Sequence, residues 1–293
     1  MMMFTTVHFL FSENINIYLQ DIGNPFLDFL FLAISAIFSE PGLLLLSSII
    51  FWCFDKGIGI RLMYLTLLSA FVAIFAKSIF GMPRPPEYLH KTPANGFGFP
   101  SGHVLPTSGF WGYLVVRLKN PPVIIMAATS IIAISLSRVY LGVHYVGDVA
   151  GGILFGLSIV LITLRTEPGI LKLLKGLERK SKYFVAVMLP LIPLTISTIQ
   201  WGLLSEQVEI GIVMAGIGVG YLLEEDHMRF ENAKNNKQRI RRFLAGMLTL
   251  SVIYFSSNLM FSDLIILKYG ALGLSSTFIA PWVFAIMETN LKN

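Results

Sequence analysis

The chain is a succession of apolar runs close to the length that crosses a lipid bilayer, separated by short polar segments. The clearest runs lie at residues 61–81, 103–118, 121–138, 147–165, 183–203, 208–223, 243–261 and 265–288. Only 13% of the 293 residues are charged and 55% are hydrophobic, whereas a soluble domain carries about 25% charged residues. Because a water-soluble core does not explain this composition, the sequence predicts an integral, multi-pass membrane protein.

The runs predict helices, since backbone amides in lipid must be bonded internally and no run alternates as a barrel strand does. We expect an all-α fold, a polytopic transmembrane helical bundle of about ten spans, in which about four extra spans follow a six-helix core. The expected segments are a mobile or interfacial lead-in (1–24), the core (25–165), a basic segment (166–182) and a C-terminal transmembrane extension (183–293).

Two features bear on how these helices are arranged. The stretch from Phe26 to Phe54 is long for one span, and Ser39-Glu40-Pro41-Gly42 interrupts it with residues that begin or break helices. This pattern favours a tight hairpin of two short helices, with one long kinked helix as the alternative. Gly216 and Gly220 have a spacing that allows helices to pack closely within the chain or, as the second interpretation, in a homodimer.

Lysine and arginine are concentrated in four connecting segments that fall on one side if every run between them spans, and that side is predicted to be cytoplasmic. These segments are residues 56–61, 117–119, 165–182 and 229–242. The net charge of +5 therefore belongs to membrane-flanking loops, and no nucleic-acid partner is expected. Thr166-Glu167-Pro168 is typical of a helix start, so residues 166–182 are predicted to form a cytoplasmic interfacial helix or a solvated basic connector.

Ionisable residues also occur on the opposite side, where the positive-inside rule does not place basic groups. Charged groups at membrane depth are costly and indicate a functional site. Two histidines and one carboxylate fall at the same level as three cations. The group comprises Lys77, Arg84, His103, Arg138, His144 and Asp148.

The local chemistry of this group suits an anion. Ser101 and Gly102 lie at a predicted helix start, where capping, free amides and the positive end of the helix dipole favour negative charge. Arg84 can hold two phosphate oxygens at once. Asp148 follows His144 by one helical turn, so its carboxylate can bond Nδ1 and leave Nε2 free as a nucleophile. Each feature alone has a structural explanation, but their combination favours a phosphate site.

These residues belong to three motifs: Lys77-x6-Arg84-Pro85, Pro100-Ser101-Gly102-His103 and Ser137-Arg138-x5-His144-x3-Asp148. Together the motifs closely resemble the full signature of the type 2 phosphatidic acid phosphatase (lipid phosphate phosphatase) family, which vanadium-dependent haloperoxidases share. The resemblance covers residues from about 61 to 165, with no departure at a specified position. More loosely, the whole chain is similar to sphingosine-phosphate-phosphatase-like members with extra C-terminal spans.

The resemblance implies a membrane-integral phosphatase, with residues 25–165 as its core, that acts on a lipid phosphomonoester or diphosphate at the extracytoplasmic face. His144 would attack phosphorus, Asp148 would orient it, and His103 would protonate the leaving oxygen and then deprotonate water. The residues that would bind the phosphate are Lys77, Arg84, Ser101, Gly102 and Arg138. Because three fixed cations can neutralise the phosphoryl oxygens, we expect no metal and no cofactor.

Other interpretations stay open at this point. A lipid phosphotransferase would use the same residues, a soluble sugar phosphate is another possible substrate, and a non-catalytic transporter or anionic-lipid scaffold would need only the cations. The loop between the first two motifs also holds Glu87, His90 and Lys91. Of these, His90 and Lys91 would either meet a second phosphate of a diphosphate substrate or be solvated. Phe97 and Phe99 would shield the site or contact lipid. The expected partners are the substrate and membrane lipids, and the expected location is a prokaryotic cell membrane.

Overall fold

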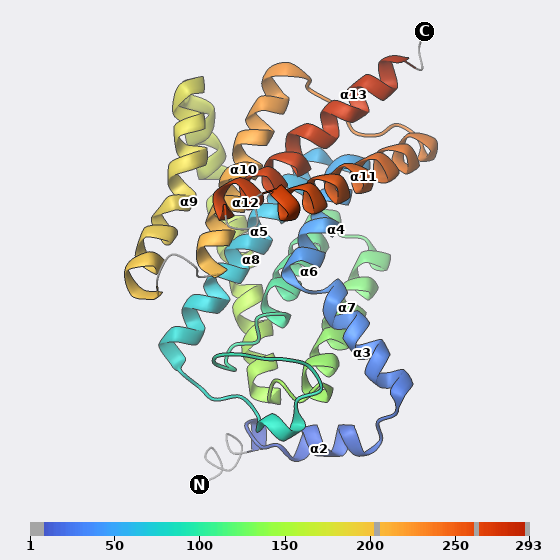
Figure 1. Ribbon diagram of the computed structural model, residues 1–293, viewed down its shortest axis with the longest axis vertical. Helices are drawn as coiled ribbons and strands as arrows, with labels where there is room; N and C mark the ends of the chain where they lie inside the picture. The colour runs from blue at the N-terminus through green and yellow to red at the C-terminus, as the bar shows by residue number, and fades with distance from the viewer. Residues whose placement is uncertain (1–8, 202–205, 261–263, 291–293) are drawn as a thin grey trace. The chain divides into compact units, whose positions relative to one another are not determined.

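The computed structural model describes residues 9–201, 206–260 and 264–290, and over these ranges the chain forms helices joined by turns, with no strand. This confirms the all-α prediction. The chain divides into two compact units: unit 1 comprises residues 1–44 and 65–167, and unit 2 comprises residues 45–64 and 168–293. Figure 1 gives the order of the helices along the chain.

Unit 1 is built from helices of the first half of the chain. Its elements are α2 (Asn14–Asp21), α3 (Pro25–Ile37), the start of α4 (Glu40–Cys53), the second part of α5 (Lys56–Phe80), the short 3-10 turn η1 (Glu87–Leu89), α6 (Val104–Leu118), α7 (Pro121–Tyr140) and most of α8 (Val146–Gly176). In Figure 1, α2 lies at the end of this unit that also holds the loop between α5 and α6.

Glycines on α8 allow this helix to lie directly against α6. A Cβ atom at Gly156 would lie 2.4 Å from the carbonyl oxygen of Leu105, and one at Gly152 would lie 3.3 Å from the carbonyl oxygen of Ser101. No real Cβ makes the first of these approaches, so the close contact of α6 and α8 requires glycine. The contact brings the Ser101 and Asp148 segments together, since the Ser101 amide donates to the Asp148 carbonyl at 3.0 Å.

Five segments in the described ranges are long and apolar enough to cross a membrane: α5, α7, α8, α11 (Asn236–Met260) and the continuous stretch Ile265–Thr289. The pair α3 and α4 makes a sixth if it is one span. This agrees with a multi-pass membrane protein but supports five or six crossings rather than the predicted ten. One reason is that α6 has only 15 residues, fewer than the ~20 that a perpendicular span needs.

The predicted tight hairpin at residues 26–54 is wrong, because α3 and α4 meet at a bend of only 59° and the chain does not reverse. The kinked helix is the better description. Helical bonding resumes at once after the break: the Leu43 amide donates to the Ser39 carbonyl at 2.9 Å. Gly42 permits the close approach of the two helices, since a Cβ there would lie 2.2 Å from the Ile37 carbonyl oxygen.

The separate helix predicted to start at Thr166-Glu167-Pro168 is also not observed. Instead α8 continues without interruption from Val146 to Gly176, with Pro168 inside it. Glu167 forms an ion pair with Arg117 and accepts a hydrogen bond from the Tyr113 hydroxyl at 3.3 Å. These contacts with α6 hold the segment in a single helix, although its composition suits a new start.

Unit 2 contains the C-terminal helices: α9 (Arg179–Trp201), α10 (Glu206–His227), α11, α12 (Ile265–Leu274), the π-helical turn η2 (Ser275–Ile279) and α13 (Ala280–Asn290). Gly216 and Gly220 on α10 meet α12 and η2, where their added Cβ atoms would lie 2.6 Å from the Gly270 carbonyl and 2.3 Å from the Thr277 hydroxyl. The spacing of these two glycines thus serves packing within the chain, as the first interpretation held.

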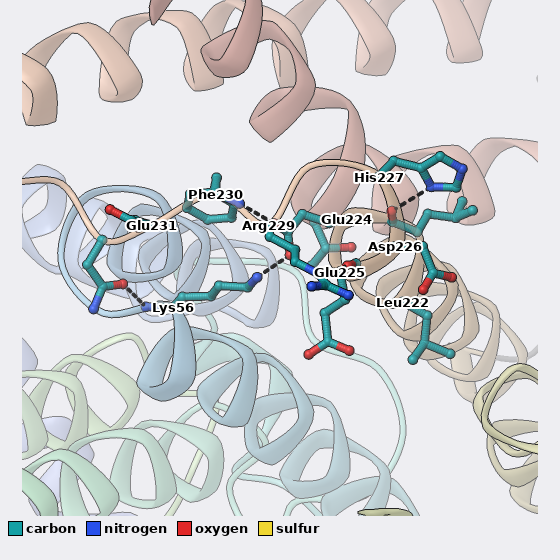
Figure 2. A network of polar contacts seen from close by, with 12 residues as sticks. Lys56, Leu222, Glu224, Glu225, Asp226, His227, Arg229, Phe230 and Glu231 are labelled. Carbon is teal, nitrogen blue, oxygen red and sulfur yellow. Dashed lines mark hydrogen bonds and ion pairs between the residues drawn. The ribbon is translucent and has the colours of Figure 1, made fainter. Parts of the chain in front are cut away.

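The end of α10 in unit 2 is held by a buried charge. The Glu224 carboxylate, which is fully buried, pairs with Lys56 and accepts the Phe230 amide at 2.7 Å (Figure 2). Lys56 also lies over the rings of Tyr221 and Phe230, about 5 Å from each centroid. A buried carboxylate is stable only with such partners, so this cluster fixes the turn after α10 to the start of α5.

Candidate active site

The predicted site residues meet where four helix ends of unit 1 converge. Lys77 lies in the last turn of α5 and Arg138 in the last turn of α7. His103 is the residue before α6, and Asp148 lies in the first turn of α8. The N-terminal ends of α6 and α8 carry positive partial charge and the C-terminal ends of α5 and α7 carry negative partial charge, so it is the cationic side chains, Lys77 and Arg138, that favour an anion here.

His144 is held on both ring nitrogens. It is 1% exposed, its Nδ1 lies 3.3 Å from Oδ2 of Asp148, and its Nε2 lies 3.3 Å from Nη1 of Arg84. The same Oδ2 accepts the Tyr145 amide at 2.9 Å, which caps the start of α8. The predicted His144–Asp148 pair is therefore formed, and Nε2 points toward a cation that can also bind a phosphoryl oxygen.

The turn that carries His144 depends on a glycine. Gly142 has φ of +71°, a conformation that residues with a side chain rarely adopt. A Cβ at this position would also lie 1.9 Å from the Leu89 carbonyl oxygen. The amide of Lys91 donates to the Leu141 carbonyl at 3.0 Å, so the long loop after α5 and the turn after α7 are joined immediately beside His144.

The three predicted cations are each fixed differently. Arg84 donates to the carbonyl oxygens of Asn95, Gly96 and Val143 at 2.8–3.2 Å. Arg138, which is 6% exposed, donates to the Ser35 hydroxyl at 2.5 Å. Lys77 reaches toward Gly102, where an added Cβ would lie 3.5 Å from its Nζ. A phosphate in this site would meet charges that are already oriented.

The nearby cations and burial in the site lower the pKa values of both histidines. Burial and the charges of Arg138, Lys77 and Arg84 lower the pKa of His103 to about 3. Burial lowers the pKa of His144 well below its usual value, and Arg84, Arg138, Lys77 and His103 lower it further. Without an anion, both imidazoles are therefore neutral at physiological pH, and His144 has the unprotonated form that a nucleophile requires.

Some buried polar atoms of the site have no partner among the described residues: the Ser101 hydroxyl, Nε of Arg138 and Oδ1 of Asp148. Buried polar groups are normally hydrogen-bonded, and exceptions call for an explanation. Ser101 and Arg138 are both in the predicted phosphate-binding set. Their unsatisfied donors are what an oxyanion would bond.

His90 and Lys91, in the loop between α5 and α6, each contact another protein group and also face an open hollow. Lys91 pairs with Asp28 at 2.6 Å, and Nε2 of His90 lies 2.9 Å from the Pro85 carbonyl oxygen. Both also line an open hollow of about 450 Å³, together with Glu87 and residues 92–95. Each of the two side chains thus has one protein partner, and a contact with a second phosphate stays a prediction.

Phe99, but not Phe97, belongs to an aromatic cluster. The Phe99 ring packs edge-on against the rings of Phe11, Phe80 and Phe155 at centroid distances of 5.0–6.2 Å. Phe97 is 45% exposed. Phe99 thus packs beside the segment that leads into Ser101, and this position agrees with the predicted shielding role of Phe99.

Sequence reasoning missed three supporting residues. Ser35 on α3 binds Arg138, and Asn16 and Gln20 on α2 bind carbonyl groups of the site loops. The N-terminal segment was predicted to be a mobile or interfacial lead-in, yet residues 14–21 form a helix attached to the site. The i, i+4 spacing of Asn16 and Gln20 was a usable signal, because it places two amides on one helix face.

Comparisons with known proteins agree with the motifs. Residues 58–170 match the PAP2 superfamily, and residues 209–292 match the transmembrane extension of PAP2 superfamily phosphatases. All eight predicted site residues lie in the first match. Human sphingosine-1-phosphate phosphatase 2 is 29% identical over 122 residues, which cover 38% of this chain and 31% of that protein.

Two further relatives are microbial. The undecaprenyl-diphosphatase of Sulfolobus acidocaldarius is 30% identical over 118 residues, covering 38% of this chain and 56% of that protein. The crystal structure of a transmembrane PAP2 type phosphatidylglycerolphosphate phosphatase from Bacillus subtilis matches at 26% identity and a TM-score of 0.48, covering 54% of this chain and 85% of that one. The chain thus spans about a third to just over half of the two curated relatives' lengths. By its two family matches, the chain belongs to the PAP2 superfamily and carries the transmembrane extension of its phosphatases.

Proposed function

We propose that the protein is an integral-membrane phosphatase that hydrolyses a lipid phosphomonoester or diphosphate through a phosphohistidine on His144. The observation that carries this proposal is the state of His144: a buried, neutral imidazole bonded to Asp148 on one nitrogen and facing Arg84 with the other. Phosphoryl transfer needs positioning and charge neutralisation more than elaborate bond-making. The surrounding cations, held in place by the protein, supply both.

The first step forms a bond between Nε2 of His144 and phosphorus and breaks the bond between phosphorus and the lipid-side oxygen. That oxygen takes a proton from His103. Binding of the anionic phosphate beside His103 offsets the three cations and raises the pKa of this imidazole, so that the group that is neutral in the free site can carry the proton.

The second step restores the enzyme. Water attacks phosphorus while His103 accepts its proton, and the N–P bond breaks so that His144 is released with inorganic phosphate. Asp148 keeps the Nδ1 proton in place and stabilises the positive charge that His144 carries in the intermediate. Lys77, Arg84, Arg138, Ser101 and the Gly102 amide bind the phosphoryl oxygens in both steps.

The substrate class and the side of the membrane are part of the same proposal. The relatives are named for sphingosine-1-phosphate and undecaprenyl diphosphate, so we expect a lipid whose tail stays in the bilayer. Asp148 lies at the start of α8, whereas Arg165, Lys172 and Lys175 lie in its later turns. The positive-inside rule then supports an extracytoplasmic site. The prokaryotic cell membrane remains a prediction.

The test is phosphate release by the purified protein in detergent with EDTA. The panel comprises sphingosine-1-phosphate, a polyprenyl diphosphate, phosphatidic acid and phosphatidylglycerol phosphate. We expect wild type to release phosphate and His144→Ala to lose at least about 10³-fold of the rate, as triad variants do elsewhere. His227→Ala, an exposed histidine of unit 2, is the matched control and should retain wild-type activity.

The alternatives give different results in the same assay. Transfer of the phosphoryl group to an added lipid alcohol, with no release of inorganic phosphate, would indicate a phosphotransferase. Binding of the lipids without release, unchanged in His144→Ala, would indicate a non-catalytic scaffold. Loss of activity in EDTA with recovery in Mg²⁺ would contradict the metal-independent mechanism.

A further inference from the structure

A polar side chain on α2 is buried against the turn that carries His144. Asn16 is fully buried, and its Nδ2 donates to the carbonyl oxygens of Val139 at 2.8 Å and of His144 at 3.0 Å. Val139 lies in the last turn of α7, and His144 lies in the turn between α7 and α8. One amide therefore spans the turn and ends on the backbone of His144 itself.

Asn16 differs from the other groups that hold His144. Asp148 and Arg84 contact the imidazole ring, and Arg84 also holds the neighbouring Val143 carbonyl at 2.8 Å. In the proposed reaction both must respond to the substrate, since Arg84 binds phosphoryl oxygens and Asp148 meets a changing charge. Both hydrogen bonds of Asn16 go to backbone carbonyls, which carry no charge that changes in the reaction, so we expect its hold on His144 to stay the same.

Gln20 provides an internal comparison one helical turn further along α2. Its Nε2 donates to the carbonyl oxygens of Leu89 and Tyr140, each at 2.8 Å. The two amides thus have the same chemistry, the same helix and the same number of bonds. They differ in target, because only Asn16 bonds to His144.

We propose that Asn16 is a positioning residue for His144, which fixes the backbone of the nucleophile so that its ring nitrogen meets phosphorus in line. This inference rests on the proposed phosphatase function. It assigns a role in the reaction to α2, which lies outside the segment that matches the PAP2 superfamily. A misplacement of about 1 Å in a reacting group can cost about a hundredfold in rate.

The experiment compares Asn16→Ala with Gln20→Ala. We expect N16A to lower kcat by ten- to a hundredfold, with KM changed less than about threefold, because the cations that bind the phosphate are untouched. Q20A should lower kcat by less than threefold, although its thermal midpoint should fall by about as much as that of N16A. If N16A is not recovered folded, Asn16→Leu replaces it, since leucine has a similar shape and donates to neither carbonyl.

A binding measurement tests the same point without turnover. Orthovanadate can take the ring nitrogen of His144 as a fifth ligand, whereas orthophosphate needs only the surrounding donors. Calorimetric titration should therefore show vanadate binding weakened about tenfold or more in N16A, with phosphate binding within twofold of wild type. Q20A should bind both as wild type does.

The outcomes separate this inference from the function on which it rests. If wild type turns over lipid phosphate but N16A and Q20A lose activity equally and in step with stability, Asn16 only helps α2 to pack and the inference is wrong. The inference is also wrong if N16A weakens vanadate and phosphate alike. If wild type neither turns over any lipid phosphate nor binds vanadate, the proposed function is wrong and the inference falls with it.

Discussion

At the scale of single residues, the site is organised around excess positive charge. Three cations surround two imidazoles, and one buried carboxylate, Asp148, is shared between His144 and the Tyr145 amide. Such an arrangement is costly in the absence of an anion and becomes favourable when a phosphate binds. Two predictions follow from the ionisation of these groups.

The first prediction concerns pH. The pKa of His103 is about 3 in the folded protein and about 6.5 when unfolded, so the unfolded chain binds more protons between these values. Stability is therefore fully present above about pH 6.5 and falls as the pH is lowered, by about 2 kcal/mol at pH 5 for this residue. The thermal midpoint in detergent should drop between pH 7.5 and pH 5.

The control for that prediction is His103→Gln, which cannot titrate. The drop should be smaller in this variant, and phosphate should reduce it in wild type because a bound anion raises the pKa of both imidazoles. Equal drops in wild type and variant would contradict the lowered pKa of His103.

The second prediction concerns the charge of Asp148. Asp148→Asn can keep an oxygen at the Oδ2 position, where it would still accept from His144 and Tyr145, and its amide would replace Oδ1, which has no partner among the described residues. The variant thus removes charge with little change of shape. We expect kcat to fall about 10²- to 10⁴-fold, measured as phosphate release, with a near-wild-type thermal midpoint.

Asp28→Asn is the comparison for Asp148, because Asp28 binds Lys91 and the Tyr140 hydroxyl in the same unit. It should lose stability but little kcat per folded molecule. An active Asp148→Asn enzyme would mean that the carboxylate orients His144 without stabilising its charge.

At the scale of helices, α8 has glycines in close contact with another helix and glycines in open space, and substitution by alanine should affect the two kinds differently. A Cβ at Gly156 would lie 2.4 Å from a backbone carbonyl of α6, whereas one at Gly169 would have nothing within 4 Å. Gly156→Ala should therefore destabilise by about 1–3 kcal/mol through overpacking. Gly169→Ala should be neutral or stabilising by up to about 1 kcal/mol, because alanine favours a helix.

Thermal midpoints of the two alanine variants in one detergent measure this difference. A lower midpoint for Gly169→Ala than for Gly156→Ala would contradict the close packing of α6 on α8. The comparison needs no substrate, so it tests the helix contact apart from the activity.

Helices also show where sequence reasoning succeeds and where it does not. The meeting of the site residues could be predicted, because ionisable groups at membrane depth usually belong to a functional site. These residues are Lys77, Arg84, Ser101, His103, Arg138, His144 and Asp148. The break at Ser39-Glu40-Pro41-Gly42 could be predicted, but not whether it is a hairpin or a bend. The continuity of α8 through Pro168 could not be predicted, since local helix signals were overridden by the contacts of Glu167 with α6. Asn16 and Ser35 act through tertiary bonds across more than a hundred residues, so local patterns, even the spacing of Asn16 and Gln20, do not reveal their partners.

At the scale of the whole molecule, the predicted site lies in one unit and a separate charge cluster stabilises the other. All predicted site residues lie in unit 1, while the buried Lys56–Glu224 pair lies in unit 2. Removing one partner of a buried pair leaves an uncompensated charge. Glu224→Ala should therefore destabilise the protein by about 3 kcal/mol or more, while phosphate release per folded molecule at low temperature stays within about threefold of wild type.

Glu231→Ala is the matched control, because Glu231 pairs with Lys234 at the surface, where both side chains are more than three-quarters exposed. No measurable change of the thermal midpoint is expected there. Loss of turnover in folded Glu224→Ala would contradict the assignment of the chemistry to unit 1.

The unbroken α8 has a consequence for where the products go. Asp148 and Arg165 lie 17 residues apart on this helix, which at 1.5 Å per residue is about 25 Å, close to the thickness of the hydrocarbon layer. On the orientation that we propose, the reaction is vectorial: phosphate leaves on the outer side and the dephosphorylated lipid stays in the outer leaflet. A cell that re-phosphorylates this lipid with cytosolic ATP must first return it across the bilayer, so hydrolysis would be only one half of a transbilayer cycle.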